Sequence, residues 1–282
     1  MATRLTVVQI FSSFSLSDHR ASMDIFVQLL FAALGGGLVV KLLDIAYREN
    51  LRKRDKRGSS RKFVEENLDP VLKSADELFG KLRALATDDF RALRHTRTHE
   101  EASLESIGLL YLLAKFWASV ETFRHKGLTV SITLDDRGQQ LGHFLDALES
   151  RKIRIADRLS QRATAEMVLN TKNNHEDMDS FTEFVKSVEA NGSAQQWTEP
   201  IVQFLMRMEH TYERQKLLTY GVVVHAMIDT LDPRHQVCRE RTSYPSKLSK
   251  KSWRDIKYRI FGRYLTFVKH PEKYLGPPKR RP

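Results

Sequence analysis

Most of the chain repeats apolar residues at the three- and four-residue spacing of an α-helix. Glycine and proline are few, at 13 and 8 of 282 residues, and alternating patterns are short. Because apolar residues at this spacing share one face of a helix, the pattern predicts an all-α protein whose helices pack as a bundle.

Two segments carry the strongest helical patterns. Asp69-Pro70 predicts a helix start, because Asp is a good N-cap and Pro suits the first turn, and an apolar stripe follows from Val71 to Ala86. The sequence from Thr98 to Glu101 resembles a capping box, and the helix after it is apolar on nearly all sides. We therefore expect the second helix to lie at the centre of the bundle.

The rest of the chain predicts further helices joined by short connections. Residues 128–134 alternate apolar and polar side chains, but a single strand without a partner makes no sheet, so we expect a connector there. The approximate bounds of the further helices are 137–169, 177–190, 197–211 and 213–231.

An apolar run precedes the bundle. Residues Ile25 to Val40 contain no charged side chain, and the run reaches the roughly 20 residues of a membrane-spanning helix by continuing to Ala46. We therefore predict a single transmembrane helix at 23–47. Residues 1–22 form an N-terminal segment that need not be native, since Met23 offers a second translation start. A helix buried in a soluble core is the alternative interpretation of the run.

Positive charge is concentrated directly after the apolar run. Only Arg4 and Arg20 precede it, whereas a basic juxtamembrane collar, 48–62, follows. The positive-inside rule therefore places the bulk of the chain in the cytoplasm, with the collar against anionic lipid of the inner leaflet. The collar residues predicted to contact lipid are Arg52, Lys53, Arg54, Lys56 and Arg57.

Small residues recur four positions apart in the apolar run, where Ala32 precedes Gly36 and Ala33 precedes Gly37. Such pairs allow two membrane helices to approach closely. They predict a homo-oligomer that associates through this face.

The last part of the chain is the most basic. The formal net charge of the whole chain is +11. We predict a helical bundle at 63–238 and, after it, a basic amphipathic segment at 239–282. Apolar residues recur there at helical spacing between cations, which predicts lipid contact on the inner leaflet. Packing of this helix on the bundle is an equal alternative, and nucleic acid binding is a third. The residues predicted to contact lipid are Trp253, Lys257, Arg259 and Arg263.

Few residues indicate chemistry. Cys238 is the only cysteine, which excludes an intrachain disulfide and a cysteine-based zinc site. The motifs of phosphate-binding loops, hydrolase elbows and zinc proteases are absent, so we expect no cofactor. We expect no metal either, because the arginines around His95 and His99 repel a cation.

Arg94 and His99 offer one enzymatic alternative. Their spacing is similar to the motif of the HEPN ribonucleases, which are small all-α proteins. The resemblance implies that the arginine would stabilise phosphate charge and the histidine would transfer a proton. A helical ribonuclease is therefore the alternative function.

Two pairs of polar residues are expected inside the bundle. His225 and Asp229 lie four positions apart, which favours an internal hydrogen bond over a catalytic base. Glu121 and Arg124 predict a partly buried ion pair, with a ligand pocket as the alternative.

Three segments carry a resemblance, and they are Asn67 to Leu82, Tyr111 to Arg124 and Ala226 to Pro233. In the same order they resemble a family of uncharacterised bacterial helical proteins with an N-terminal hydrophobic segment. The resemblance implies a helical, bacterial protein; the family has no established activity, so it assigns no functional residue. We expect a single-pass protein of the bacterial inner membrane whose cytosolic bundle acts on an unknown protein partner as a regulator, sensor or effector.

Overall fold

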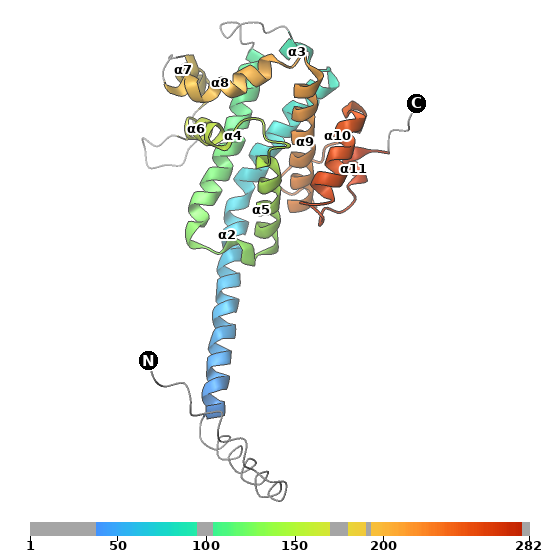
Figure 1. Ribbon diagram of the computed structural model, residues 1–282. Helices are drawn as coiled ribbons and strands as arrows, with labels where there is room; N and C mark the ends of the chain where they lie inside the picture. The colour runs from blue at the N-terminus through green and yellow to red at the C-terminus, as the bar shows by residue number, and fades with distance from the viewer. Residues whose placement is uncertain (1–37, 95–103, 170–179, 190–192, 278–282) are drawn as a thin grey trace, which may run out of the picture. The chain divides into compact units, whose positions relative to one another are not determined.

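A computed structural model describes residues 38–94, 104–169, 180–189 and 193–277 of the chain. Within these ranges the fold is all-α, as predicted, and no β-strand is present (Figure 1). The chain divides into two units, Met1–Asp55 and Lys56–Pro282, and the first described helix, α2, belongs to both.

The second unit contains most of the helices. The α-helices are α2 (Leu38–Thr87), α3 (Arg91–Arg94), α4 (Leu104–Lys126), α5 (Asp136–Glu149), α6 (Arg158–Glu166), α7 (Phe181–Glu189), α8 (Ser193–Met206), α9 (Thr211–Leu231), α10 (Lys250–Asp255) and α11 (Glu272–Leu275). Short 3-10 helices are η2 (Gly127–Thr129), η3 (Ile132–Leu134) and η4 (Pro245–Lys247), and a π-helix, η5 (Ile256–Phe261), continues α10.

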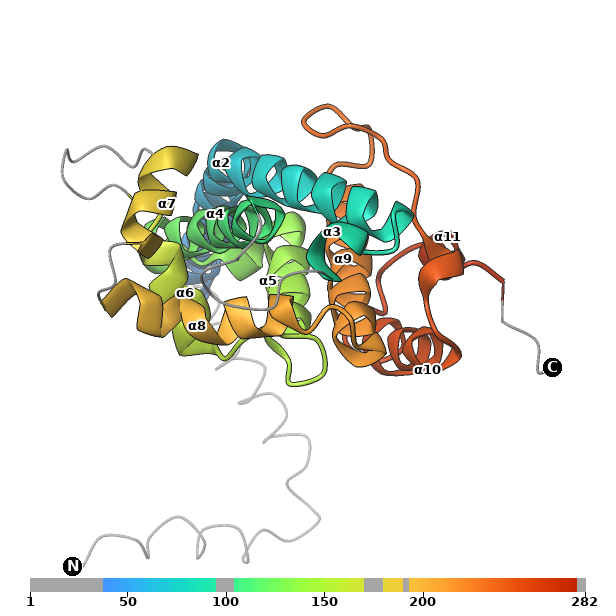
Figure 2. The same cartoon turned by 90° about the horizontal axis from the view of Figure 1, so that it is seen from above.

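Helices α4 and α9 are the most buried elements. Every residue of α9 from Leu217 to Ile228 is buried, and α4 buries residues on several sides, as its all-round apolar pattern predicts. The indole N–H of Trp117 donates to the hydroxyl of Tyr220 at 2.9 Å, which joins the two helices inside the core. Helix α5 packs against α9, and α6 packs against α4 and α8 (Figure 2).

The helix start predicted at Asp69-Pro70 is wrong, because Pro70 lies inside α2. An interior proline lacks its N–H donor and costs about 3 kcal/mol. Val64 and Leu68 before the proline and Leu72 after it are fully buried in the same core. Their common packing keeps the helix continuous through Pro70.

The helix predicted at 137–169 is divided into α5 and α6. Ser150 has the extended backbone conformation that ends α5. The side chain of Asp157 accepts hydrogen bonds from the N–H groups of Leu159 and Ser160, which starts a new helix. The connector expected at 128–134 is confirmed, since that stretch forms 3-10 turns.

The C-terminal segment packs on the bundle. Ile256, Ile260 and Phe261 are buried in the common core, so the apolar face expected from the sequence faces protein. Trp253, one of the residues predicted to contact lipid, is only 7% exposed and packs within the same core. Lys257 is exposed on the outer side, as are Arg259 and Arg263.

The first half of α2 has a different character. Residues 41–59 are all exposed, and they include Leu42, Leu43 and Ile45. None of the helices within the described ranges combines the length and the apolar composition that crossing a bilayer requires. Residues 23–37 of the predicted transmembrane helix lie outside the described residues, with the predicted oligomer face of Ala32, Ala33, Gly36 and Gly37.

Candidate functional site

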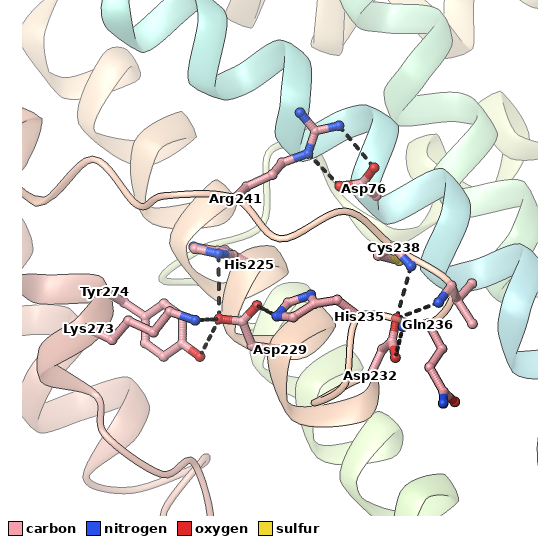
Figure 3. Close-up of polar contacts among 11 residues, drawn as sticks. Asp76, His225, Asp229, Asp232, His235, Gln236, Cys238, Arg241, Lys273 and Tyr274 are labelled. Carbon is pink, nitrogen blue, oxygen red and sulfur yellow. Dashed lines mark hydrogen bonds and ion pairs between the residues drawn. The ribbon is translucent and has the colours of Figure 1, made fainter.

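Polar side chains gather around Asp229 near the end of α9 (Figure 3). The Lys273 Nζ lies 2.6 Å from Asp229 Oδ2, and the Tyr274 hydroxyl donates to the same oxygen at 3.0 Å. His225 Nε2 lies 3.5 Å from Oδ2, and His235 Nε2 lies 3.8 Å from Oδ1. We name these five residues the Asp229 cluster. One carboxylate thus joins α9, the turn after it and α11.

The cluster is largely closed to solvent. The side chains of His225 and Asp229 are 2% and 8% exposed, and Phe79 stacks on the His225 ring at 4.2 Å. Burial lowers the pKa of His225 to about 4, against the opposite effect of Asp229. Burial also raises the pKa of the Tyr274 hydroxyl, as does Asp229. At neutral pH the His225 imidazole beside Asp229 is therefore uncharged.

This geometry favours a structural role. A histidine acts as a base only when its imidazole reaches a substrate proton. Here the Phe79 ring stacks on His225 and the Tyr274 ring lies nearly perpendicular to it, so both cover the imidazole. The His225 to Asp229 contact expected from the sequence is present, but at 3.5 Å it is longer than an ordinary hydrogen bond. The cluster fastens α11 to α9.

Asp232 holds the turn that follows α9. Its carboxylate accepts hydrogen bonds from the N–H groups of Gln236, Val237 and Cys238 at 2.8–2.9 Å. Burial opposes ionisation of Asp232, but these N–H groups together lower its pKa. The Cys238 thiol points back to α2 and contacts the Leu72 carbonyl oxygen at 3.3 Å.

A bidentate ion pair makes the next contact with α2. Arg241 Nε and Nη2 donate to the two carboxylate oxygens of Asp76 at 2.5 and 2.9 Å. A Cβ on Gly80 would stand 3.0 Å from the Arg241 guanidinium, so the glycine leaves room for this side chain. The chain after α9 is thus tied to α2 as well as to α9.

The sequence identified only part of this network. The spacing of His225 and Asp229 marks one helix face, whereas Lys273 and Asp229 lie 44 positions apart and Arg241 and Asp76 lie 165 apart. A single sequence carries no local pattern that pairs residues over such separations.

The partly buried ion pair predicted for Glu121 and Arg124 is confirmed. Arg124 Nη1 lies 2.8 Å from Glu121, and its Nη2 lies 2.5 Å from Glu149 of α5. Burial opposes the charge on Arg124, yet Glu149 and Glu121 raise its pKa. Arg158 extends the network to α6 through Glu149 at 3.5 Å.

The remaining predicted site residues are dispersed. Arg94 ends α3, and His99 lies outside the described residues, so the ribonuclease alternative stays a prediction. Within the described ranges, no three His, Cys, Asp or Glu side chains are grouped to hold a metal ion. The predicted lipid-contact residues Arg52, Lys53, Arg54, Lys56 and Arg57 are exposed on α2.

No protein-family model, curated protein sequence or solved structure matches this chain. The resemblance to uncharacterised bacterial helical proteins therefore stays a prediction. The functional assignment depends on the geometry of the chain itself.

Proposed function

We propose that the protein is a single-pass protein of a bacterial inner membrane, whose helical bundle lies on the cytoplasmic side and acts through interactions as a regulator, sensor or effector. The observation that carries the proposal is the exposed surface of α2 over residues 41–57. This surface joins apolar residues to a basic collar along one helix.

The apolar part supports a membrane attachment. Leu42, Leu43 and Ile45 are 59%, 66% and 62% exposed, and in sequence they continue the uncharged run that ends at Val40. Apolar area removed from water stabilises an assembly by about 25 cal/mol per Å². Insertion of the run into a bilayer would cover these side chains.

The basic part supports the orientation. The exposed collar cations follow the apolar residues within one to three helical turns, where they reach the headgroups of anionic lipid. Asp44 pairs with Arg48 at 3.0 Å, so it does not neutralise the cations further along the helix.

The buried polar residues support an interaction role. The sequence singled out the side chains of Cys238, His225 and Asp229. Each of them contacts another element: Cys238 contacts α2, and His225 and Asp229 contact α11. The outer surface is left to contact partners.

Fractionation of a C-terminally tagged chain tests the proposal. The full chain is compared with a chain starting at Ser59, and both pellets are washed with carbonate and then detergent. The truncation keeps the contacts of α2 within the second unit, including Ser60, whose hydroxyl donates to the Ser131 carbonyl at 2.9 Å. We expect detergent alone to release the full chain and the truncation to be soluble.

Release of the full chain by carbonate would contradict the membrane attachment. A His99→Ala variant tests the interaction role separately. Cleavage of RNA by the purified chain that is lost in this variant would identify a ribonuclease instead.

A further inference from the structure

A pocket of about 310 Å³ lies between α9, α10, η5 and the loop that follows α5. Lys152, Lys216, Lys251 and Arg259 line it, and Asp255 is the one acidic residue of this lining. Ile153 and Ile260 add apolar surface to its wall. Four cations from four parts of the chain thus meet around one small volume.

Lys216 is the most enclosed of these cations. Its side chain is partly buried, and its Nζ lies 5.6 Å from the centre of the Phe204 ring. Burial lowers the pKa of Lys216, and nearby Arg154 acts in the same direction, while Glu213 opposes both without cancelling them. An anion in the pocket would oppose the effects of burial and of Arg154, because it would stabilise the positive charge of Lys216 where solvent reaches it poorly.

Asp255 does not supply that compensation. Its carboxylate lies 3.3 Å from Arg259 Nη1, one helical turn further on. The three lysines have no such carboxylate within the lining. The pocket therefore keeps an excess of positive charge.

Hydrogen bonds fix one side of the pocket before any ligand arrives. The side chain of Gln215 accepts from the Ser249 N–H at 2.7 Å and donates to the Lys247 carbonyl at 2.9 Å. The Ser249 hydroxyl donates to that of Ser252 at 3.0 Å, which leaves the Ser252 hydroxyl hydrogen free to turn to a ligand. A site held in this way loses little entropy on binding.

We propose that this pocket binds the phosphate group of a small phosphate monoester. Lysines bind phosphate as point charges, and the volume is at the lower end for small-ligand sites, which are roughly 300 to 1,000 Å³. An adjoining groove shares Lys251, Asp255 and Arg259 with the pocket and adds Lys250 and Arg254. The cationic surface therefore continues beyond the phosphate position.

Two sources carry this chemistry: a soluble phosphate monoester and the headgroup of phosphatidic acid. The lining residues lie between Lys152 and Ile260, so the inference stands without the proposed membrane attachment. Glycerol phosphate and phosphatidic acid differ in their acyl chains alone, which makes the two sources separable by experiment.

Isothermal titration calorimetry on the purified full chain in non-ionic detergent tests the pocket. The probes are glycerol phosphate, inorganic phosphate and dihexanoyl phosphatidic acid, with dihexanoyl phosphatidylcholine as the uncharged-headgroup control. We expect binding of glycerol phosphate or phosphatidic acid that weakens with salt, and no binding of phosphatidylcholine. Equal binding of glycerol phosphate and phosphatidic acid indicates the soluble source. Binding of phosphatidic acid alone indicates the lipid.

Lys216→Met removes the enclosed charge near Phe204 and keeps an unbranched apolar side chain there. Lys251→Gln removes an exposed charge from the rim. We expect Lys216→Met to weaken binding about tenfold, since a charged hydrogen bond contributes about 1.5 kcal/mol or more. Lys251→Gln should weaken it less. Lys269→Gln, an exposed cation outside the pocket, should leave it unchanged. No binding of any probe, or equal binding by Lys216→Met and Lys269→Gln, would overturn the proposal.

Discussion

The hydroxyl oxygen of Tyr244 lies 2.0 Å from the position that a Cβ on Gly221 would occupy. From there the hydroxyl donates to the Leu218 carbonyl at 3.1 Å, inside the core. Burial raises the pKa of this hydroxyl. Because residue 221 has no side chain, α9 can receive the segment that follows it in sequence.

Gly221→Ala should therefore destabilise the protein by about 1 to 3 kcal/mol, the usual cost of overpacking a core. The penalty should fall when Tyr244→Phe removes the clashing oxygen. Urea unfolding followed by circular dichroism measures both. Gly142→Ala is the matched control, because no atom lies within 4 Å of a Cβ there and the position is exposed in α5. Equal penalties in the two Tyr244 backgrounds would contradict this account of the contact.

The stability of the protein should fall as the pH decreases from about 6.5 to about 4. His225 is neutral in the folded protein because burial lowers its pKa to about 4, whereas an exposed histidine in the unfolded chain binds a proton near pH 6.5. The unfolded state thus binds more protons over this range. This difference removes on the order of 3 kcal/mol from the free energy of unfolding, and the loss ends below pH 4.

His225→Phe tests the assignment, because it keeps an aromatic ring against Phe79 and cannot titrate. We expect its free energy of unfolding to depend less on pH between 6.5 and 4 than that of the wild-type protein. His235 and Lys273, the other basic side chains that face Asp229, are present in both proteins. Identical pH profiles would show that another group causes the acid sensitivity.

The helical class of the fold follows from the sequence because helical periodicity is local. The prediction of a helix start at Pro70 is wrong because packing between distant residues offsets the free-energy cost of a proline inside a helix. No local pattern reveals that packing. The same reason limits what the sequence predicts about Asp229. Its contact with His225, one helical turn away, is predicted, whereas its contact with Lys273 of another element is not. The pocket around Lys216 also assembles from separate parts of the chain, each of which resembles an ordinary basic surface in sequence.

Cys238 should react slowly with thiol reagents in the native protein. The side chain is 5% exposed, and burial raises the pKa of its thiol to about 12, with Asp76 as a further cause. Thiolate is the reactive form, so both access and ionisation oppose modification. Labelling with an aromatic disulfide reagent should accelerate strongly in urea. Fast labelling of the wild-type protein without urea would contradict the buried position.

The predicted oligomer face gives the last test, because it separates association through the membrane from association through the bundle. If residues 23–47 form a membrane helix, Gly36 and Gly37 lie on the face where two helices approach closely, and Gly35 lies largely to one side of it. Replacing Gly36 and Gly37 with Ile should abolish dimers in a membrane association assay, since the added side chains separate the helix backbones. Gly35→Ile adds the same kind of side chain and should have a weaker effect. Dimers that survive the double replacement would indicate that the face does not mediate self-association.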